Sequence, residues 1–352
     1  MTDCGQAPRP AKLGVIEGFY GKPWPGADRL NFIRELSATG ASFYYYAPKA
    51  DRSLRRNWQQ SFSAAQRGYL GSLRSACADD QLEFGIGFSP HQIWESWDTA
   101  TRHALADKLH ELAAIEIDTL CVLFDDMHGA KADLARLQIE IVDYVADHAR
   151  VKHLVVCPTY YSLDDTLDRV FGERPADYLQ RLGEGLDGGV DVFWTGPQVA
   201  SAAVSDAHLD EIGALLRRPP FLWDNVFAND GRLATQFLNL DFERHTVLPN
   251  RNKLAGIAVN PMNQIWLSRH VLTAFAARLG AVGKTSQLPS GTAALLQRYD
   301  LEFRQLGLPG LAPDRIRSML TEFAPFADQR EAAEVIAWLG GEFAFDPECL
   351  TD

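Results

Sequence analysis

The sequence predicts an α/β protein: a (β/α)8 TIM barrel followed by a small C-terminal helical region. Short apolar runs alternate eight times with longer segments of helical periodicity. The runs show little polar-apolar alternation, which is typical of parallel strands covered on both faces. A chain of 352 residues with 46% hydrophobic content can bury a core of this size. Eight strand-then-helix units together indicate a closed barrel.

The predicted strands are apolar, β-branched or aromatic runs, at 13–20, 42–48, 83–90, 119–126, 153–161, 191–199, 220–226 and 254–262. Helical periodicity is clear after the fourth run, where Leu134, Leu137 and Ile141 share one predicted helix face. An open doubly wound sheet is the alternative architecture. It is disfavoured because no Gly-x-Gly-x-x-Gly motif follows the first run.

The sequence pattern changes after about residue 285. A Pro-Ser-Gly sequence at 289–291 interrupts the chain, and three amphipathic segments follow near 291–306, 314–322 and 328–340. We therefore predict two units, a barrel at 11–285 and a helical appendage at 286–352.

Composition excludes several classes of partner. A net charge of −12 argues against nucleic acid and anionic lipid, whose affinity depends on basic side chains. No apolar run is long enough to cross a bilayer, and the N-terminus has no apolar targeting segment. The cysteines lack Cys-x-x-Cys spacing, which predicts no structural zinc; they are Cys4, Cys77, Cys121, Cys157 and Cys349. We expect a cytoplasmic protein without a cofactor.

Two adjacent carboxylates, Asp125 and Asp126, end the fourth run, where a barrel carries its active site. Carboxylates at the end of a buried strand are costly unless they are used or neutralised. Successive residues leaving a strand point in different directions, so the pair cannot flank one bond as ordinary glycosidase carboxylates do. Two other interpretations remain open. The pair could cap a helix beginning near Ala130, or it could bind a divalent cation with His128.

Aromatic and polar side chains occupy the other predicted strand ends. Flat apolar walls suit the C–H faces of a sugar, and five aromatic residues could form them: Tyr20, Tyr46, Tyr161, Trp194 and Trp223. Sugar hydroxyls need fixed polar partners, and four candidates follow the same strands: Lys49, Asn225, Asp230 and Asn260.

These segments resemble glycoside hydrolase family 84, the family of O-GlcNAcases and bacterial β-N-acetylglucosaminidases. The matching motifs occur in family order: GVIEGFYGKPW at 14–24, YAPK at 46–49, LFDD at 123–126, CPT at 157–159, WTGP at 194–197, LWDN at 222–225 with AND at 228–230, and NP at 260–261. The resemblance covers residues 13 to about 285. It implies the barrel fold independently of the periodicity.

The resemblance also implies a retaining, substrate-assisted mechanism, in which the 2-acetamido oxygen of the substrate attacks the anomeric carbon and forms an oxazoline. It implies that Asp125 orients the acetamide, that Asp126 is the general acid and base, and that Tyr161 assists the acetamido oxygen. Residues implied in substrate binding are Gly18, Lys49, Thr195, Trp223, Asn225, Asp230 and Asn260. The expected partner is a glycoconjugate or glycopeptide with terminal β-linked GlcNAc.

Two other functions remain open. One is a metal-dependent hydrolase or lyase that uses Asp125, Asp126 and His128. The other is a non-catalytic GlcNAc-binding module, which would have no use for a general acid. The sequence specifies neither the aglycone nor the oligomeric state, and a homodimer is among the expected assemblies.

Overall fold

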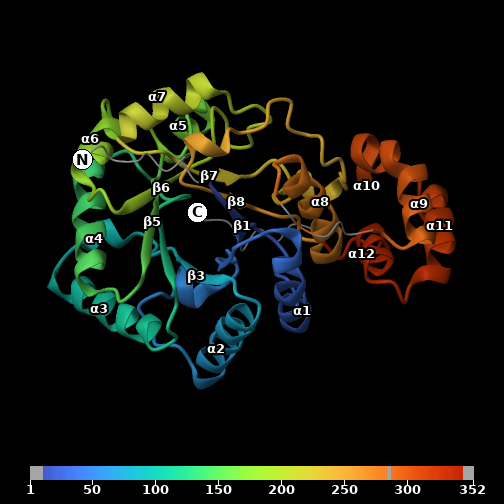
Figure 1. The fold of residues 1–352 in the computed structure, drawn as a ribbon, viewed down its shortest axis with the longest axis horizontal. Coiled ribbons are helices and arrows are strands. Elements are labelled where there is room, and N and C mark those ends of the chain that lie inside the picture. The colour runs from blue at the N-terminus through green and yellow to red at the C-terminus, as the bar shows by residue number, and fades with distance from the viewer. Residues whose placement is uncertain (1–10, 282, 284–286, 344–352) are drawn as a thin grey trace, which may run out of the picture.

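A computed structural model describes residues 11–281, 283 and 287–343. Its centre is a closed barrel of parallel strands paired in sequence order from β1 to β8, with β8 returning to β1 (Figure 1). The strands are β1 Lys12–Glu17, β2 Phe43–Tyr46, β3 Glu83–Phe88, β4 Thr119–Leu123, β5 His153–Cys157, β6 Val190–Trp194, β7 Phe221–Asp224 and β8 Gly256–Val259. Each lies within or overlaps one predicted run, so the predicted barrel is confirmed.

Helices connect the strands on the outside of the barrel (Figure 1). They are α1 Gly26–Leu36, α2 Ala64–Asp79, α3 Thr99–Ala113, α4 Leu134–His148, α5 Asp165–Phe171, α6 Tyr178–Gly185, α7 Asp206–Leu216 and α8 Ile265–Arg278. Helix α4 begins at Leu134 after Asp133, not near Ala130 as predicted. The aspartate pair at 125–126 therefore lies too far ahead of α4 to cap it, and the capping interpretation is wrong.

Helices α9 Ser290–Leu301, α10 Gly307–Gly310, α11 Pro313–Phe323 and α12 Arg330–Leu339 form the C-terminal region. A π-helical turn, Glu302–Leu306, joins α9 to α10. These helices lie beside α8, with α12 next to it (Figure 1). The division proposed between 285 and 286 falls outside the described residues and stays a prediction. Within the described ranges, no helix is long and apolar enough to span a membrane.

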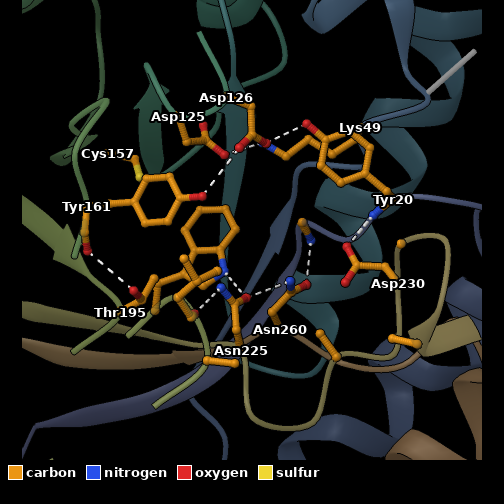
Figure 2. Close-up of a pocket in the computed structure, with 17 residues that line it drawn as sticks. Tyr20, Lys49, Asp125, Asp126, Cys157, Tyr161, Thr195, Asn225, Asp230 and Asn260 are labelled. Carbon is orange, nitrogen blue, oxygen red and sulfur yellow. Dashed lines mark hydrogen bonds and ion pairs between the residues drawn. The ribbon is translucent and has the colours of Figure 1, made fainter. Parts of the chain in front are cut away.

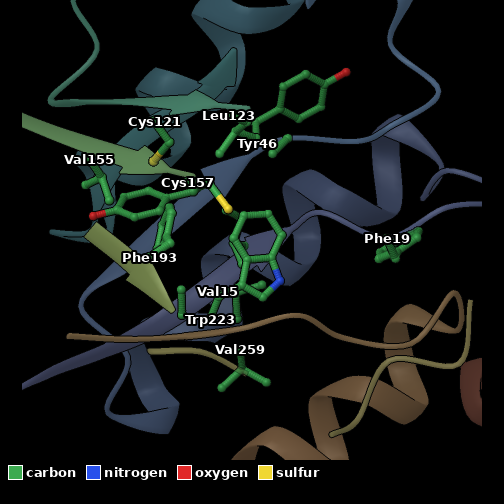
Figure 3. Close-up of a cluster of buried hydrophobic side chains, with 14 of the residues drawn as sticks. Val15, Phe19, Tyr46, Cys121, Leu123, Val155, Cys157, Phe193, Trp223 and Val259 are labelled. Atoms are coloured by element: carbon green, nitrogen blue, oxygen red, sulfur yellow. The ribbon is translucent and has the colours of Figure 1, made fainter. Parts of the chain in front are cut away.

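Aromatic rings and small residues fill the barrel interior below the strand ends. Phe43 stacks on Tyr45 with 4.3 Å between ring centroids, and Phe221 packs edge-on against Phe43 at 5.8 Å. Phe193 extends this cluster, since its ring centroid lies 5.0 Å from that of Phe221 and 5.1 Å from that of Trp223; Figure 3 shows Phe193 and Trp223 among the buried side chains. The three cysteines within the described ranges are buried free thiols, Cys77, Cys121 and Cys157. Cys4 and Cys349 lie outside the described residues.

Candidate active site

A pocket of about 340 Å³ opens at the carboxyl ends of the strands (Figure 2). All ten residues predicted as catalytic or substrate-binding line it: Gly18, Lys49, Asp125, Asp126, Tyr161, Thr195, Trp223, Asn225, Asp230 and Asn260. They follow seven of the eight strands, and only the loop after β3 contributes none of them. Residues far apart in the sequence meet here because parallel strands end at one edge of a barrel.

Both aspartates contact one ammonium group. Lys49 donates a short hydrogen bond to Oδ2 of Asp125, and its Nζ lies 3.5 Å from Oδ2 of Asp126. The backbone of Asp126 is left-handed, with φ 56°, which interrupts the strand-like alternation of side chains. Adjacent carboxylates therefore share one environment. They contact the same cation and cannot stand on opposite sides of a substrate bond.

Two tyrosine hydroxyls reach the second aspartate of the pair (Figure 2). Tyr20 donates a short hydrogen bond to Oδ2 of Asp126, and Tyr161 donates to Oδ1 over 3.4 Å. Arg55 is buried behind Tyr20, and its Nη2 donates to the Tyr20 hydroxyl over 2.9 Å. Asp126 is thus held by phenol groups, whereas Oδ1 of Asp125 is buried without a hydrogen-bond partner. That free acceptor is available to a donor on a ligand.

These surroundings shift the pKa values of the two carboxylates in opposite directions. Burial raises the pKa of Asp125 and outweighs the opposing effect of Lys49. Burial also opposes ionisation of Asp126, but Lys49 and the Tyr20 hydroxyl outweigh it and lower the pKa of Asp126. Burial disfavours the ammonium of Lys49, yet the two carboxylates raise the pKa of Lys49 above its ordinary value. In the empty pocket, a single proton on the pair therefore favours Asp125.

A hydrogen-bonded amide cluster forms the opposite wall. Oδ1 of Asn225 accepts from Trp223 Nε1 at 2.8 Å and from Asn260 Nδ2 at 2.9 Å. Oδ1 of Asn260 accepts from the backbone N–H of Gly18 at 3.1 Å. A Cβ atom at Gly18 would lie 2.3 Å from the Trp223 ring, so only glycine fits against this tryptophan without a shift. The loops after β1, β7 and β8 are thereby fixed against one another.

Asp230 and Thr195 complete the lining. Oδ2 of Asp230 accepts from the backbone N–H of Tyr20 at 2.8 Å. Burial raises the pKa of Asp230, and the Tyr20 N–H partly offsets this effect. Thr195 donates its hydroxyl to the carbonyl of Gln198 at 2.8 Å, which leaves its methyl group for the pocket.

The aromatic prediction is correct for three residues of five. Tyr20, Tyr161 and Trp223 line the pocket, whereas Tyr46 and Trp194 do not. Tyr46 is buried and donates to Asp51, and Trp194 is fully buried with Nε1 directed at His208. The indole and the phenol find these partners beside the barrel wall, because a buried N–H or O–H needs an acceptor.

The predicted site residues did not include Cys157, which lines the pocket, or Arg55, which lies behind its lining and contacts Tyr20. Cys157 is buried in the core and also lines the pocket. Burial raises the pKa of its thiol, which disfavours a reactive thiolate. Arg55 was not singled out, because it lies in a loop well beyond the predicted end of the second strand. No periodic pattern in the sequence predicts that Arg55 is buried against Tyr20.

Comparison with known proteins assigns the family. A family model described as beta-N-acetylglucosaminidase matches residues 13–296. The chain belongs to this β-N-acetylglucosaminidase family. Its matched region covers every strand of the barrel and all ten predicted site residues.

Relatives of this β-N-acetylglucosaminidase family member include the proteins named Protein O-GlcNAcase of Mus musculus and Rattus norvegicus. Each is 30% identical over 257 residues, which is 70% of this chain and 28% of the relative. The chain thus corresponds to less than a third of the length of these relatives. A mutant of an O-GlcNAc hydrolase from Thermobaculum terrenum has the same fold, with TM-score 0.66 and 23% identity over 94% of this chain and 81% of that one.

The metal-binding alternative lacks its third ligand in this family member. Nδ1 of His128 lies 2.6 Å from the carbonyl oxygen of Phe171, away from the aspartate pair. Among residues 11–281, 283 and 287–343, no three His, Cys, Asp or Glu side chains come together as a metal site. The proposed set of Asp125, Asp126 and His128 is therefore wrong.

Proposed function

We propose that this protein is a retaining β-N-acetylglucosaminidase that removes terminal β-linked GlcNAc by substrate-assisted catalysis. The observation that carries the proposal is the contact of both Asp125 and Asp126 with Lys49. Protein carboxylates that act as acid and nucleophile stand on either side of the bond, about 5 Å or more apart. Two carboxylates on one cation leave the nucleophile to the substrate, and the 2-acetamido oxygen is the group that can supply it.

In this proposal, Asp125 accepts the acetamido N–H with its unpartnered Oδ1. This hydrogen bond favours the ionised form of Asp125 and moves the shared proton to Asp126. Asp126 then protonates the leaving oxygen as the acetamido oxygen closes the oxazoline ring. In the second step it takes a proton from water, which opens the ring with net retention. Tyr161 donates toward the acetamido oxygen in this assignment.

The remaining lining residues hold the sugar. Lys49 and the Gly18 backbone bind the 3-hydroxyl side, and Asp230 with Asn260 binds the 4- and 6-hydroxyls. Asn225, Trp223 and Thr195 shape the acetamido pocket. A site that pairs the acetamide leaves buried polar groups unpaired with plain glucose, so we expect strong discrimination against β-glucosides.

Hydrolysis of aryl β-GlcNAc with graded leaving groups tests the acid assignment. We expect Asp126→Asn to lose roughly 10²- to 10⁴-fold in turnover with a poor leaving group and far less with an activated one. Asp133→Asn, at an exposed carboxylate ahead of α4, is the matched control. A loss that is independent of the leaving group would contradict the role of Asp126.

Acetamide participation has its own test. Replacing the N-acetyl hydrogens stepwise by fluorine makes the acetamido oxygen a poorer nucleophile, so turnover should fall at each step. A thiazoline analogue of the oxazoline should inhibit. Turnover that is indifferent to fluorination would overturn the substrate-assisted mechanism.

The substrate class, the cellular location and the oligomeric state are also part of the proposal. The relatives named Protein O-GlcNAcase favour a GlcNAc-modified peptide over chitobiose, and a paired hydrolysis assay separates them. We also propose a cytoplasmic location without nucleic-acid or membrane binding, which the acidic composition supports. Light scattering in solution distinguishes the homodimer from the monomer.

A further inference from the structure

Helix α12 contacts the first turn of α8, which follows the loop after β8, and it also contacts the loop after β7. We propose that Glu334 and Trp338 of α12 are positioning residues that hold these loops, so that the C-terminal helical region is part of the binding site. The inference rests on the proposed glycosidase function for its kinetic readout. Neither residue lines the pocket, and both act through the backbone of the barrel.

The Glu334 side chain caps the first turn of α8. Its carboxylate accepts from the backbone N–H of Trp266 at 3.0 Å and from that of Leu267 at 2.9 Å. These amides have no partner within α8, because the first N–H groups of a helix never do. The structure shows no capping side chain from Gln264, which precedes the helix, so a residue 70 positions along the chain supplies the cap. Burial raises the pKa of Glu334 to about 8, and the amide N–H groups offset this effect only in part, so the cap acts through hydrogen bonds more than through charge.

The first turn of α8 is joined to the pocket by five residues. This connection begins at Asn260, which accepts from Gly18, and includes Asn263. Asn263 donates from Nδ2 to the carbonyl of Tyr20 at 3.0 Å, and its backbone N–H donates to Asn229 at 2.9 Å. Fixing the start of α8 therefore fixes the segment that ties the loops after β1, β7 and β8 together.

Trp338 contacts the loop after β7, which contains Asp230 and Thr235. Its indole is fully buried, and Nε1 donates to the carbonyl of Thr235 at 3.1 Å. Thr235 follows Ala234, which lines the pocket, and its own N–H is bonded to Gly231. Gly231 in turn follows Asp230. One helical face, through residues four apart, thus supports both loops that present Asp230 and Asn260.

The expected effect is on binding more than on chemistry. Asp125 and Asp126 follow β4 and are held by Lys49 and Tyr161, which α12 does not contact, and by Tyr20, of which only the backbone is tied to the segment ahead of α8. Loosening the α12 contacts should therefore weaken the grip on the sugar while the acid and the acetamide-orienting group stay in place. If the α12 contacts served folding alone, their loss would lower stability and leave KM and kcat of the folded enzyme unchanged.

Glu334→Gln tests the inference, because it keeps the shape of the side chain but replaces one of the two carboxyl oxygens that accept from the Trp266 and Leu267 amides by an NH2 group, which cannot accept. Glu331→Gln is the matched control. Glu331 lies one turn earlier on α12 and pairs with Arg269 at 3.0 Å, in the same interface but away from the loop. We expect Glu334→Gln to raise KM for aryl β-GlcNAc and Ki for the thiazoline roughly five- to tenfold, with kcat within about twofold. Glu331→Gln should lower Tm without changing KM.

Hydrogen exchange supplies a readout that needs no substrate. Amides at 260–267 and 229–236 should exchange faster in Glu334→Gln than in Glu331→Gln, and those at 119–126 should not. Trp338→Phe, which removes the N–H to Thr235, should act mainly on 229–236, and it carries the test if Glu334→Gln does not fold. Equal KM and equal exchange in all variants would overturn the inference. Absence of GlcNAc hydrolysis in the wild type would instead overturn the proposed function and leave the exchange test standing.

Discussion

The hydroxyl of Tyr20 donates a hydrogen bond to Oδ2 of Asp126, and Arg55 donates to that same hydroxyl from behind. The phenol oxygen is therefore an acceptor on one side and a donor on the other. This arrangement orients the Tyr20 proton toward the carboxylate, which favours the ionised form of Asp126 in the empty pocket. The general acid of the proposed reaction is protonated only when a ligand changes that balance.

Tyr20→Phe should shift the acid limb of the kcat/KM profile to higher pH. The Tyr20 hydrogen bond lowers the pKa of Asp126, so its removal raises that pKa. The productive pair carries one proton, and this form exists between the lower and the upper pKa of the pair. Raising the lower pKa moves the acid limb upward. A pH series with aryl β-GlcNAc measures the shift, and Tyr144→Phe, whose hydroxyl meets the Arg102 carbonyl on the outer helices, should leave it unchanged.

Asn225 and Asn260 should be energetically coupled in substrate binding. Each single alanine substitution breaks the 2.9 Å hydrogen bond between them, so the double variant loses it only once. A double-mutant cycle on kcat/KM should give a coupling energy of about 1 kcal/mol. Strictly additive effects would contradict the role of Asn225 Oδ1 as a shared acceptor.

His245→Ala should destabilise the fold strongly. Nε2 of His245 lies 2.9 Å from Oδ2 of Asp224 at the end of β7, and both side chains are almost inaccessible. The alanine variant leaves the Asp224 carboxylate buried without its imidazole, which costs roughly 3–5 kcal/mol. Urea denaturation measures the loss. Adding Asp224→Asn to His245→Ala should recover part of it, whereas His148→Ala, at an exposed histidine, should have little effect.

The fold and most of the site could be predicted from the sequence, because both depend on local pattern. Parallel strands buried on both faces leave continuous apolar runs, and the residues that end those runs must meet at one edge. Lys49, Asp125 and Asn260 are each one to three residues beyond a strand, so their convergence followed from the barrel alone.

The misses arise where contacts between distant segments decide the outcome. Trp194 is the last residue of β6, whereas Trp223 is the penultimate residue of β7, and the indole of Trp194 turns outward to His208 on α7. Arg55 contacts the Tyr20 hydroxyl from a loop, and Glu334 contacts the first turn of α8 from beyond the barrel. Arg55 belongs to no periodic pattern, and the amphipathic pattern around Glu334 does not say which element that residue contacts, so the sequence carried no signal that connected either residue with the pocket.

The fit between Gly18 and Trp223 has a consequence for sequence variation. A methyl group at position 18 would overlap the indole, so alanine there should remove most activity in this background. The residue at position 223 therefore limits which residues are tolerated at position 18, and the reverse holds as well. In a library that randomises both codons, active variants with alanine at position 18 should carry a smaller ring or an aliphatic side chain at position 223. The smaller side chain makes room for the alanine methyl group, but it removes part of the aromatic wall of the pocket. The substitutions that this active site tolerates are thus set by pairs of contacting residues from different strands, not by each residue alone.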